Sequence, residues 1–235
     1  MKVAIMQPYF FPYLGYFSLV KHTDRFILLD TVQFIYHGWI ERNRILKPQD
    51  GWQYIKAPLL RHKRESLICD IKIRNEEPWQ VKILAQLRQY KQLAPHFYEV
   101  MQLCESILFT PSDNIASFNA SSIQAILKYL NIHKSVEVFS NLPIIIDKPQ
   151  APDEWALNIC KAINVSEYWN PPGGKHFFNP NKYINSNIFL RFHEVTLSSY
   201  NQQRPTFEPG LSILDVLMFN SIEEVNRMLD NFILS

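Results

Sequence analysis

The feature that most constrains the fold is the segment at residues 3–20, VAIMQPYFFPYLGYFSLV, where six aromatic side chains lie between Gln7 and Phe17. Pro8 and Pro12 interrupt this segment, and each lacks the backbone N–H that a central strand needs. A secretory signal would be aliphatic, free of proline and followed by a small-residue cleavage site. The segment therefore predicts a short buried strand over residues 2–7 and then a rigid aromatic loop.

The next elements predict a parallel pair of strands. Residues 16–21 are expected to be helical, and residues 25–30 (RFILLD) form a second buried strand that ends at a carboxylate. A strand, loop, helix and strand within about thirty residues is typical of a βαβ unit, whose two strands are parallel. The composition, with 47% apolar and 20% charged residues, is that of a globular protein.

The middle of the chain is expected to be mainly helical. Weaker strands are predicted at 54–57 and 69–74, followed by a helix behind Pro78 and an apolar stripe over 97–108. Ser112 is the predicted N-cap of a third helix.

The proline-rich segment 143–152 is the best internal boundary. It subdivides a single unit of 235 residues into residues 1–142 and residues 153–235. In the second part we expect a helix from residue 153 and strands at 167–169 and 188–192. Two final helices follow, with S-x-x-D/E capping boxes. The boxes pair Ser212 with Asp215 and Ser221 with Glu224.

The predicted class is α/β, with a Rossmann-like parallel-sheet core at the N-terminus that is distantly nucleotidyltransferase-like. A helical middle and a mixed α/β C-terminal part complete it.

Charge, cysteine usage and hydropathy exclude several kinds of partner. The net charge of +2 gives no reason to expect nucleic-acid binding, and no apolar run approaches the ~18–20 residues that span a bilayer. Cys69, Cys104 and Cys160 are scattered and lack CxxC spacing, which indicates a reducing compartment and no metal site. We expect a cytoplasmic protein.

The candidate site residues follow the first two strands, because ligands of parallel sheets bind at the carboxyl ends of the strands. Rigid aromatic walls with a few oriented polar groups are typical of small-molecule pockets. The polar candidates are Gln7, Tyr9, Tyr13 and Tyr16 after the first strand, and Asp30, Gln33, His37, Arg42, Asn43 and Arg44 after the second.

One spacing in the aromatic loop points toward phosphate binding. Tyr13-Leu14-Gly15-Tyr16 is similar to the H-x-G-H of nucleotidyl-transferring α/β enzymes, whose imidazoles face ATP phosphates, with tyrosine in place of each histidine. Gly15 would let the backbone approach a phosphate, and Arg42 and Arg44 would pair with it.

Each of these candidates also has a structural alternative. The aromatic loop, above all Phe10, Phe11 and Phe17, can simply plug the end of the sheet. Asp30 is a general base if it is buried and a loop cap otherwise, and His37 is either an acid/base group or a structural histidine.

A second candidate site is Gly173-Gly174-Lys175, where paired glycines can expose backbone N–H groups to an anion beside a lysine. A tight loop between strands explains these residues equally well. Tyr200 and Gln202 are expected near the same region. The basic run at residues 61–64 is either an anion contact or a solvated loop.

Several blocks of the sequence together resemble the WbqC-like family. They are MQPYFFPYLGYF, FILLDTVQF with GWIERNRI, YWNPPGGK, YNQ and LSILDVLMFNS, in order along nearly the whole chain. Glu41 departs from the family pattern, which has a second asparagine there. The resemblance implies a bacterial protein of surface-polysaccharide (O-antigen) biosynthesis that attaches an acyl or aminoacyl group to an amino sugar.

Two function classes follow from these observations. The first is an enzyme that forms an amide, such as a glycyl amide, on a nucleotide-linked amino sugar, using ATP or an activated acyl donor. Asp30 or His37 would take the proton, and the tyrosines and arginines would hold the phosphates. The alternative is a non-catalytic nucleotide-sugar binding or assembly protein, which the loss of both histidines favours. A hydrolase acting on the same sugars is a third option.

Overall fold

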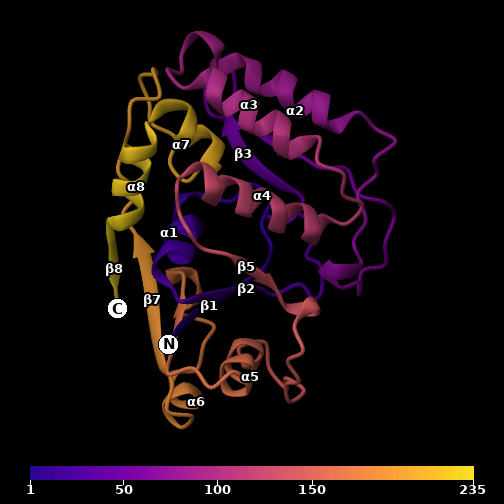
Figure 1. Cartoon of the computed structure of the whole chain (residues 1–235), viewed down its shortest axis with the longest axis vertical. Coiled ribbons are helices and arrows are strands. Elements are labelled where there is room, and N and C mark those ends of the chain that lie inside the picture. Colours follow the sequence, from indigo (N-terminus) through magenta and orange to yellow (C-terminus); the bar gives the residue numbers. More distant parts are fainter.

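The computed structural model describes all 235 residues and has a mixed α/β architecture, as predicted (Figure 1). Its central sheet has six strands in the order β5-β2-β1-β6-β7-β8, and a separate hairpin is formed by β3 and β4. All neighbours in the sheet are parallel except β8, which is antiparallel to β7. The strands are β1 (Lys2–Met6), β2 (Arg25–Leu28), β3 (Arg42–Leu46), β4 (Trp52–Lys56), β5 (Val136–Val138), β6 (Glu167–Asn170), β7 (Phe189–Val195) and β8 (Phe232–Leu234).

Helices cover both faces of the sheet. They are α1 (Leu14–His22), α2 (Trp79–Leu87), α3 (Phe97–Leu108), α4 (Ile115–Tyr129), α5 (Glu154–Ala162), α6 (Pro180–Ile184), α7 (Ile213–Phe219) and α8 (Ile222–Asp230). Short 3-10 helices lie at Ile68–Asp70, Arg88–Gln92, Phe139–Asn141 and Pro172–Gly174. None of these helices combines the length and the hydrophobicity needed to cross a bilayer.

Alternation along the strands explains the three layers. Ala4, Phe26 and Leu28 point into the larger core, which α1, α3, α4, α7 and α8 complete. Val3 and Ile27 point into a smaller core under α5. Figure 1 shows α5 and α6 on one side of the sheet and α2, α3 and α4 on the other.

The predicted βαβ unit at the N-terminus is confirmed. Strand β1 is parallel to β2, with Val3 opposite Arg25 and Met6 opposite Leu28, and α1 connects the two strands. The other neighbour of β1 is β6, so the segments before and after residues 143–152 contribute to one sheet.

Two segments differ from the sequence-based expectation. Residues 42–46 form strand β3 and pair with β4, although no strand was predicted there. Residues 69–74 do not form a strand, because this segment makes only isolated β-bridges, through Lys72 and Ile73. The side chains of Ile71 and Ile73 are buried, which gives the sequence the alternation of a strand.

The helix caps also correct the prediction in part. The cap of α4 is Asn114, whose Oδ1 accepts from the Ser117 N–H, and not Ser112. The capping box of Ser221 and Glu224 is confirmed. Ser212 caps α7, but the Asp215 side chain does not close a box with it, because that carboxylate binds elsewhere.

Candidate functional site

A cleft of about 1040 Å³ lies at the carboxyl ends of the central strands. Chain connections leave β1 toward β2 and leave β6 toward β7, so the strand order reverses between β1 and β6. Open α/β sheets bind ligands at such a switch point. Gln7 directly follows β1, and Asn170 ends β6, and both line the cleft.

The lining of the cleft is aromatic and amidic, and it contains no Asp, Glu, His, Lys or Arg. The aromatic lining residues are Tyr9, Trp155, Tyr168, Phe177 and Phe178, and the side-chain amides are those of Gln7, Gln33, Gln150 and Asn170. The cleft is therefore suited to an uncharged ligand with polar groups and flat faces, such as a sugar or a base.

The first wall is built by the start of the aromatic loop. The Tyr16 hydroxyl donates to the Gln7 carbonyl oxygen at 3.0 Å, and the rings of Tyr9 and Tyr16 lie 5.7 Å apart. The Gln7 amide makes no hydrogen bond within the chain, so it is available to a ligand. Burial raises the pKa of Tyr9, whose hydroxyl therefore stays protonated near neutral pH.

The second wall is the turn after β6. The Asn170 Nδ2 donates to the Tyr168 hydroxyl at 2.6 Å. A Cβ on Gly174 would lie 2.3 Å from the Asn170 Oδ1 and 2.8 Å from the Phe178 ring, so only glycine fits there. A Cβ on Gly173 would meet nothing within 4 Å. Gly174 is therefore required for close packing, whereas Gly173 leaves the backbone open to the cleft.

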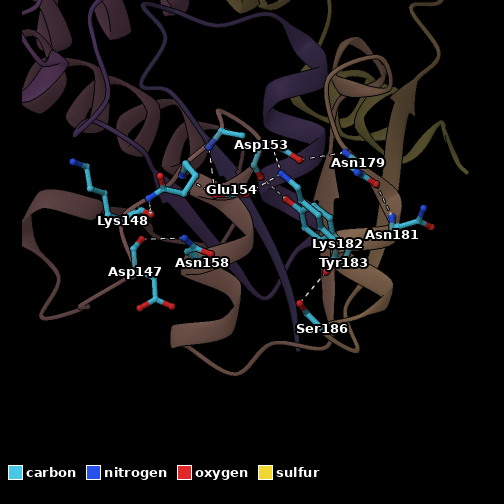
Figure 2. Close-up of polar contacts among 12 residues, drawn as sticks. Asp147, Lys148, Asp153, Glu154, Asn158, Asn179, Asn181, Lys182, Tyr183 and Ser186 are labelled. Atoms are coloured by element: carbon cyan, nitrogen blue, oxygen red, sulfur yellow. Dashed lines mark hydrogen bonds and ion pairs between the residues drawn. The ribbon is translucent and has the colours of Figure 1, made fainter.

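The third wall is the segment 149–152 together with Trp155 on α5. Figure 2 shows how α6 fastens this wall. The Lys182 ammonium lies 3.0 Å from the Asp153 carboxylate and 2.9 Å from that of Glu154. Glu154 in turn accepts from the backbone N–H of Gln150 at 2.7 Å.

The predicted site residues divide into two groups. Five of them line the cleft, namely Gln7, Tyr9, Gln33, Gly173 and Gly174. The remaining predicted residues lie outside it, namely Tyr13, Gly15, Tyr16, Asp30, His37, Arg42, Asn43, Arg44, Lys175, Tyr200 and Gln202. The expectation that the tyrosines and arginines share one cavity is therefore wrong.

The YLGY segment packs against itself. A Cβ on Gly15 would lie 2.5 Å from the Tyr13 ring, so this glycine admits an aromatic ring where a phosphate contact was expected. Tyr16 is fully buried, and burial raises the pKa of Tyr13 to about 12. Both groups keep their protons at neutral pH and bring no charge.

Asp30 and His37 are placed as structural residues. The Asp30 carboxylate is buried and accepts from the Ser140 N–H at 3.0 Å and from its hydroxyl at 2.6 Å, so it caps the 3-10 turn at residues 139–141. His37 is exposed with φ 62° in a turn, and its carbonyl oxygen accepts from Arg42 at 2.6 Å. Neither side chain reaches the cleft.

The side chains of Arg42, Asn43 and Arg44 on β3 make structural contacts with the hairpin and with the loops beside it. The Arg42 guanidinium lies 4.1 Å from the centre of the Tyr54 ring. The Arg44 guanidinium lies between Trp39 and Trp52, and it donates to the Gly210 carbonyl oxygen at 3.2 Å. Asn43 is buried and donates to the carbonyl oxygens of the aromatic loop.

Tyr200 and Gln202 do not lie near the glycine pair. Together with Tyr90 they surround the buried Asp215 carboxylate, which accepts from Tyr90 at 2.6 Å and from Gln202 at 3.0 Å. Burial raises the pKa of Asp215. This network fixes the loop before α7. Lys175 is exposed beside the cleft turn, 5.7 Å from the centre of the Phe192 ring.

The residue-based prediction missed most of the third wall. Trp155 was predicted only as part of the helix from residue 153, and Gln150 belongs to the segment that was interpreted as a boundary. Three proline residues within a short apolar segment are a signal for a rigid loop that carries a site as much as for a linker. No group of three or more His, Cys, Asp or Glu side chains is placed to hold a metal ion.

Comparisons with known proteins give one family and one relative. The model of the WbqC-like protein family matches residues 7–227. "Uncharacterized protein Rv1507c" of Mycobacterium tuberculosis is 28% identical over 227 residues, which cover 93% of each chain. No solved structure matches the chain.

Proposed function

The chain belongs to the WbqC-like protein family, and from this premise we propose that it is an enzyme of cell-surface polysaccharide biosynthesis acting on a nucleotide-linked amino sugar. The observation that carries the proposal is the uncharged aromatic cleft at the switch point of the sheet. Sugars present apolar ring faces and hydroxyl edges, and aromatic rings together with side-chain amides complement both. Among the four amides of the cleft, that of Gln7 makes no hydrogen bond within the chain, whereas those of Gln33, Gln150 and Asn170 each donate one.

The reaction that we propose is amide formation on the sugar. The amine attacks the carbonyl carbon of an activated acyl or aminoacyl group, a C–N bond forms, and the activating group leaves with its electron pair. The amine proton must pass to a base. ATP or a preformed acyl donor supplies the activation. Gln7 and the open backbone at Gly173 are the chain's own groups that can orient the acceptor.

A second candidate function is nucleotide-sugar binding without catalysis. The observation that favours it is the absence of any carboxylate or imidazole from the cleft lining. With Asp30 bound to Ser140 and His37 in an exposed turn, the proton-transfer role has no residue of the chain assigned to it.

The binding step is tested with Trp155→Ala, because Trp155 lines the cleft on α5. We expect this change to weaken binding of a nucleotide-linked 4-amino sugar by about tenfold, since one stacked aromatic ring contributes on the order of 1 kcal/mol. Isothermal titration calorimetry measures the affinity. Tyr98→Ala is the matched control, because Tyr98 is an exposed aromatic residue on α3 outside the cleft and should bind as the wild type does.

The chemical step is tested by incubating the protein with the same sugar, glycine or an acyl thioester, and ATP. Mass spectrometry that detects the amide supports the enzyme. Binding without product supports the second candidate. If no 4-amino sugar binds, or if Trp155→Ala binds as tightly as the wild type, the cleft is not the sugar site.

A further inference from the structure

The charge distribution around the cleft raises the question of where a diphosphate would bind. A nucleotide-linked sugar carries a diphosphate with strong hydrogen-bond acceptors, which are normally matched by arginine, lysine or backbone N–H groups. The cleft lining supplies no cation. A cation that pairs with the diphosphate would therefore lie at the rim of the cleft, beside the open backbone at Gly173.

The residues Arg61, His62, Lys63 and Arg64, called here the basic segment, lie against one wall of the cleft. Gln33 lines the cleft, and its Nε2 donates to the Arg64 carbonyl oxygen at 2.8 Å. The Tyr36 and His62 rings stack with their centres 5.0 Å apart. These contacts place the basic segment next to the part of the lining formed by Gln33 and Ile35.

The cations of the basic segment have no acidic partner. Arg61, Lys63 and Arg64 are exposed and form no ion pair, whereas Arg25 and Lys182 are each paired with a carboxylate. Three positive charges within four residues, with Glu65 as the adjacent acid, leave this part of the rim positive. An unpaired cluster of this kind attracts anions.

The arginines of β3 are not available for the same purpose. Arg42 donates to the carbonyl oxygens of His37 and Gly38, and Arg44 is enclosed by two tryptophan rings. The Arg44 Nε has no hydrogen-bond partner, but it is buried, and neither guanidinium lines the cleft. Lys148 and Lys175 are also exposed and adjoin lining residues, but each is a single charge, so the basic segment is the stronger cationic site near the cleft.

We propose that the basic segment binds the diphosphate that joins the sugar to its nucleotide, while the sugar occupies the uncharged cleft. This inference rests on the proposed function, which places the sugar in the cleft. It extends that function by assigning the anion to Arg61, Lys63 and Arg64.

The test uses inorganic pyrophosphate alone, so that it does not depend on the identity of the sugar. We expect the wild-type chain to bind pyrophosphate in calorimetry at low ionic strength, and the affinity to fall as salt is added. The triple variant Arg61→Gln, Lys63→Gln, Arg64→Gln should lose at least about tenfold in affinity. All three side chains are exposed, and Gln33 bonds to a backbone atom of Arg64, so the fold should be retained.

The matched control is the triple variant Lys82→Gln, Arg88→Gln, Lys91→Gln, which removes the same charge from exposed positions on α2 and the 3-10 turn that follows it. It should bind pyrophosphate within twofold of the wild type. Equal losses in both variants, or no binding by the wild type, would overturn the proposal. So would binding of phosphatidylglycerol vesicles through the basic segment without binding of pyrophosphate. If pyrophosphate binds as expected but no amino sugar does, the proposed function fails and the anion site stands.

Discussion

At the scale of single residues, Asn43 shows how one side chain fixes the aromatic loop. Its Nδ2 donates to the carbonyl oxygens of Phe10 at 3.1 Å and Phe11 at 2.9 Å, and its Oδ1 accepts from the Arg44 N–H at 2.8 Å. Phe11 has φ 41°, a left-handed conformation that is unusual for an aromatic residue. The loop holds this conformation because its carbonyl groups accept from Asn43 on β3 and, at Phe11, also from the Ser212 hydroxyl before α7.

We expect Asn43→Ala to lower the free energy of unfolding by about 2 kcal/mol, because the Phe10 carbonyl oxygen loses its side-chain donor and the Phe11 carbonyl oxygen keeps only the Ser212 hydroxyl. Urea denaturation followed by circular dichroism measures this change. Asn141→Ala is the control, because Asn141 is exposed at the end of the 3-10 turn and should change the value by less than about 0.5 kcal/mol. Equal effects of the two substitutions would contradict the role of Asn43.

Residue types near Asn43 also show why individual roles were hard to predict. Tyrosine, arginine and glycine within a few residues of a strand end are typical of a phosphate site, and they are equally typical of a packed loop. The Tyr13 ring over Gly15 and the Arg44 guanidinium between tryptophans select the second interpretation. Only the side-chain geometry distinguishes the two.

At the scale of elements, His193 joins β7 to two helices. It is 2% exposed, and its Nε2 lies 3.1 Å from the Ser18 Oγ on α1. The Ser18 hydroxyl donates to the Leu229 carbonyl oxygen on α8 at 2.5 Å. Burial, with a smaller contribution from His22, lowers the pKa of His193 from 6.5 to about 4.

The lowered pKa of His193 predicts a loss of stability in mild acid. The folded chain holds the neutral imidazole, so this contribution is complete above the unfolded pKa of 6.5 and is lost as the pH falls toward 4. We expect it to reduce the free energy of unfolding by about 2 kcal/mol between about pH 7 and pH 5, as the linkage relation gives for this pair of pKa values. Urea denaturation across this range measures the slope.

Two substitutions test whether His193 is the source of this slope, and the second of them is the control. His193→Gln removes the titrating group and should flatten the slope, whatever its effect on stability at pH 7. His176→Gln, at an exposed position, should keep the wild-type slope. A slope that is the same in all three proteins would exclude His193 as its source.

The elements that could be predicted are those with a strong apolar pattern. The parallel pair at the N-terminus and the helix at residues 97–108 follow from apolar strand runs and from a helical stripe. The hairpin β3–β4 was missed because Arg42 and Arg44 alternate with Asn43 and Ile45, and the arginines pack on aromatic rings that the sequence does not show as neighbours. Strands β5 and β8 are three residues each and carry too little pattern.

At the scale of the whole molecule, strand order decides which segments meet at the site. The sequence shows that β1 and β2 are adjacent, and from this the residues after both strands were expected to form the cavity. The structure places β6 on the other side of β1. The switch point therefore brings residues 149–155 and 170–178 to Gln7, and only Gln33 among the polar candidates after β2 reaches the same cleft. Long-range pairing of this kind has no local sequence signal.

The same topology leaves one wall of the cleft without a strand of its own. Segment 149–152 has no ladder hydrogen bonds and is held by side chains, chiefly through Glu154 and Asp153 (Figure 2). Lys182 on α6 binds both carboxylates, and Tyr183 donates to the Asp153 carbonyl oxygen at 3.2 Å. The rigidity of this wall should therefore depend on a helix that does not itself line the cleft.

We expect Lys182→Met to increase amide hydrogen exchange severalfold at Gln150 and Ala151, because Glu154 then loses the ammonium that holds it where it accepts from these two N–H groups. Exchange measured by mass spectrometry reports on this segment, and the melting temperature should change little because the substituted side chain is 31% exposed. Lys161→Met, at an exposed position in the last turn of α5, is the control and should leave the exchange of residues 149–152 unchanged. If Lys182→Met leaves these amides as protected as in the wild type, α6 does not fasten the wall, and the proline residues of the segment must hold it instead.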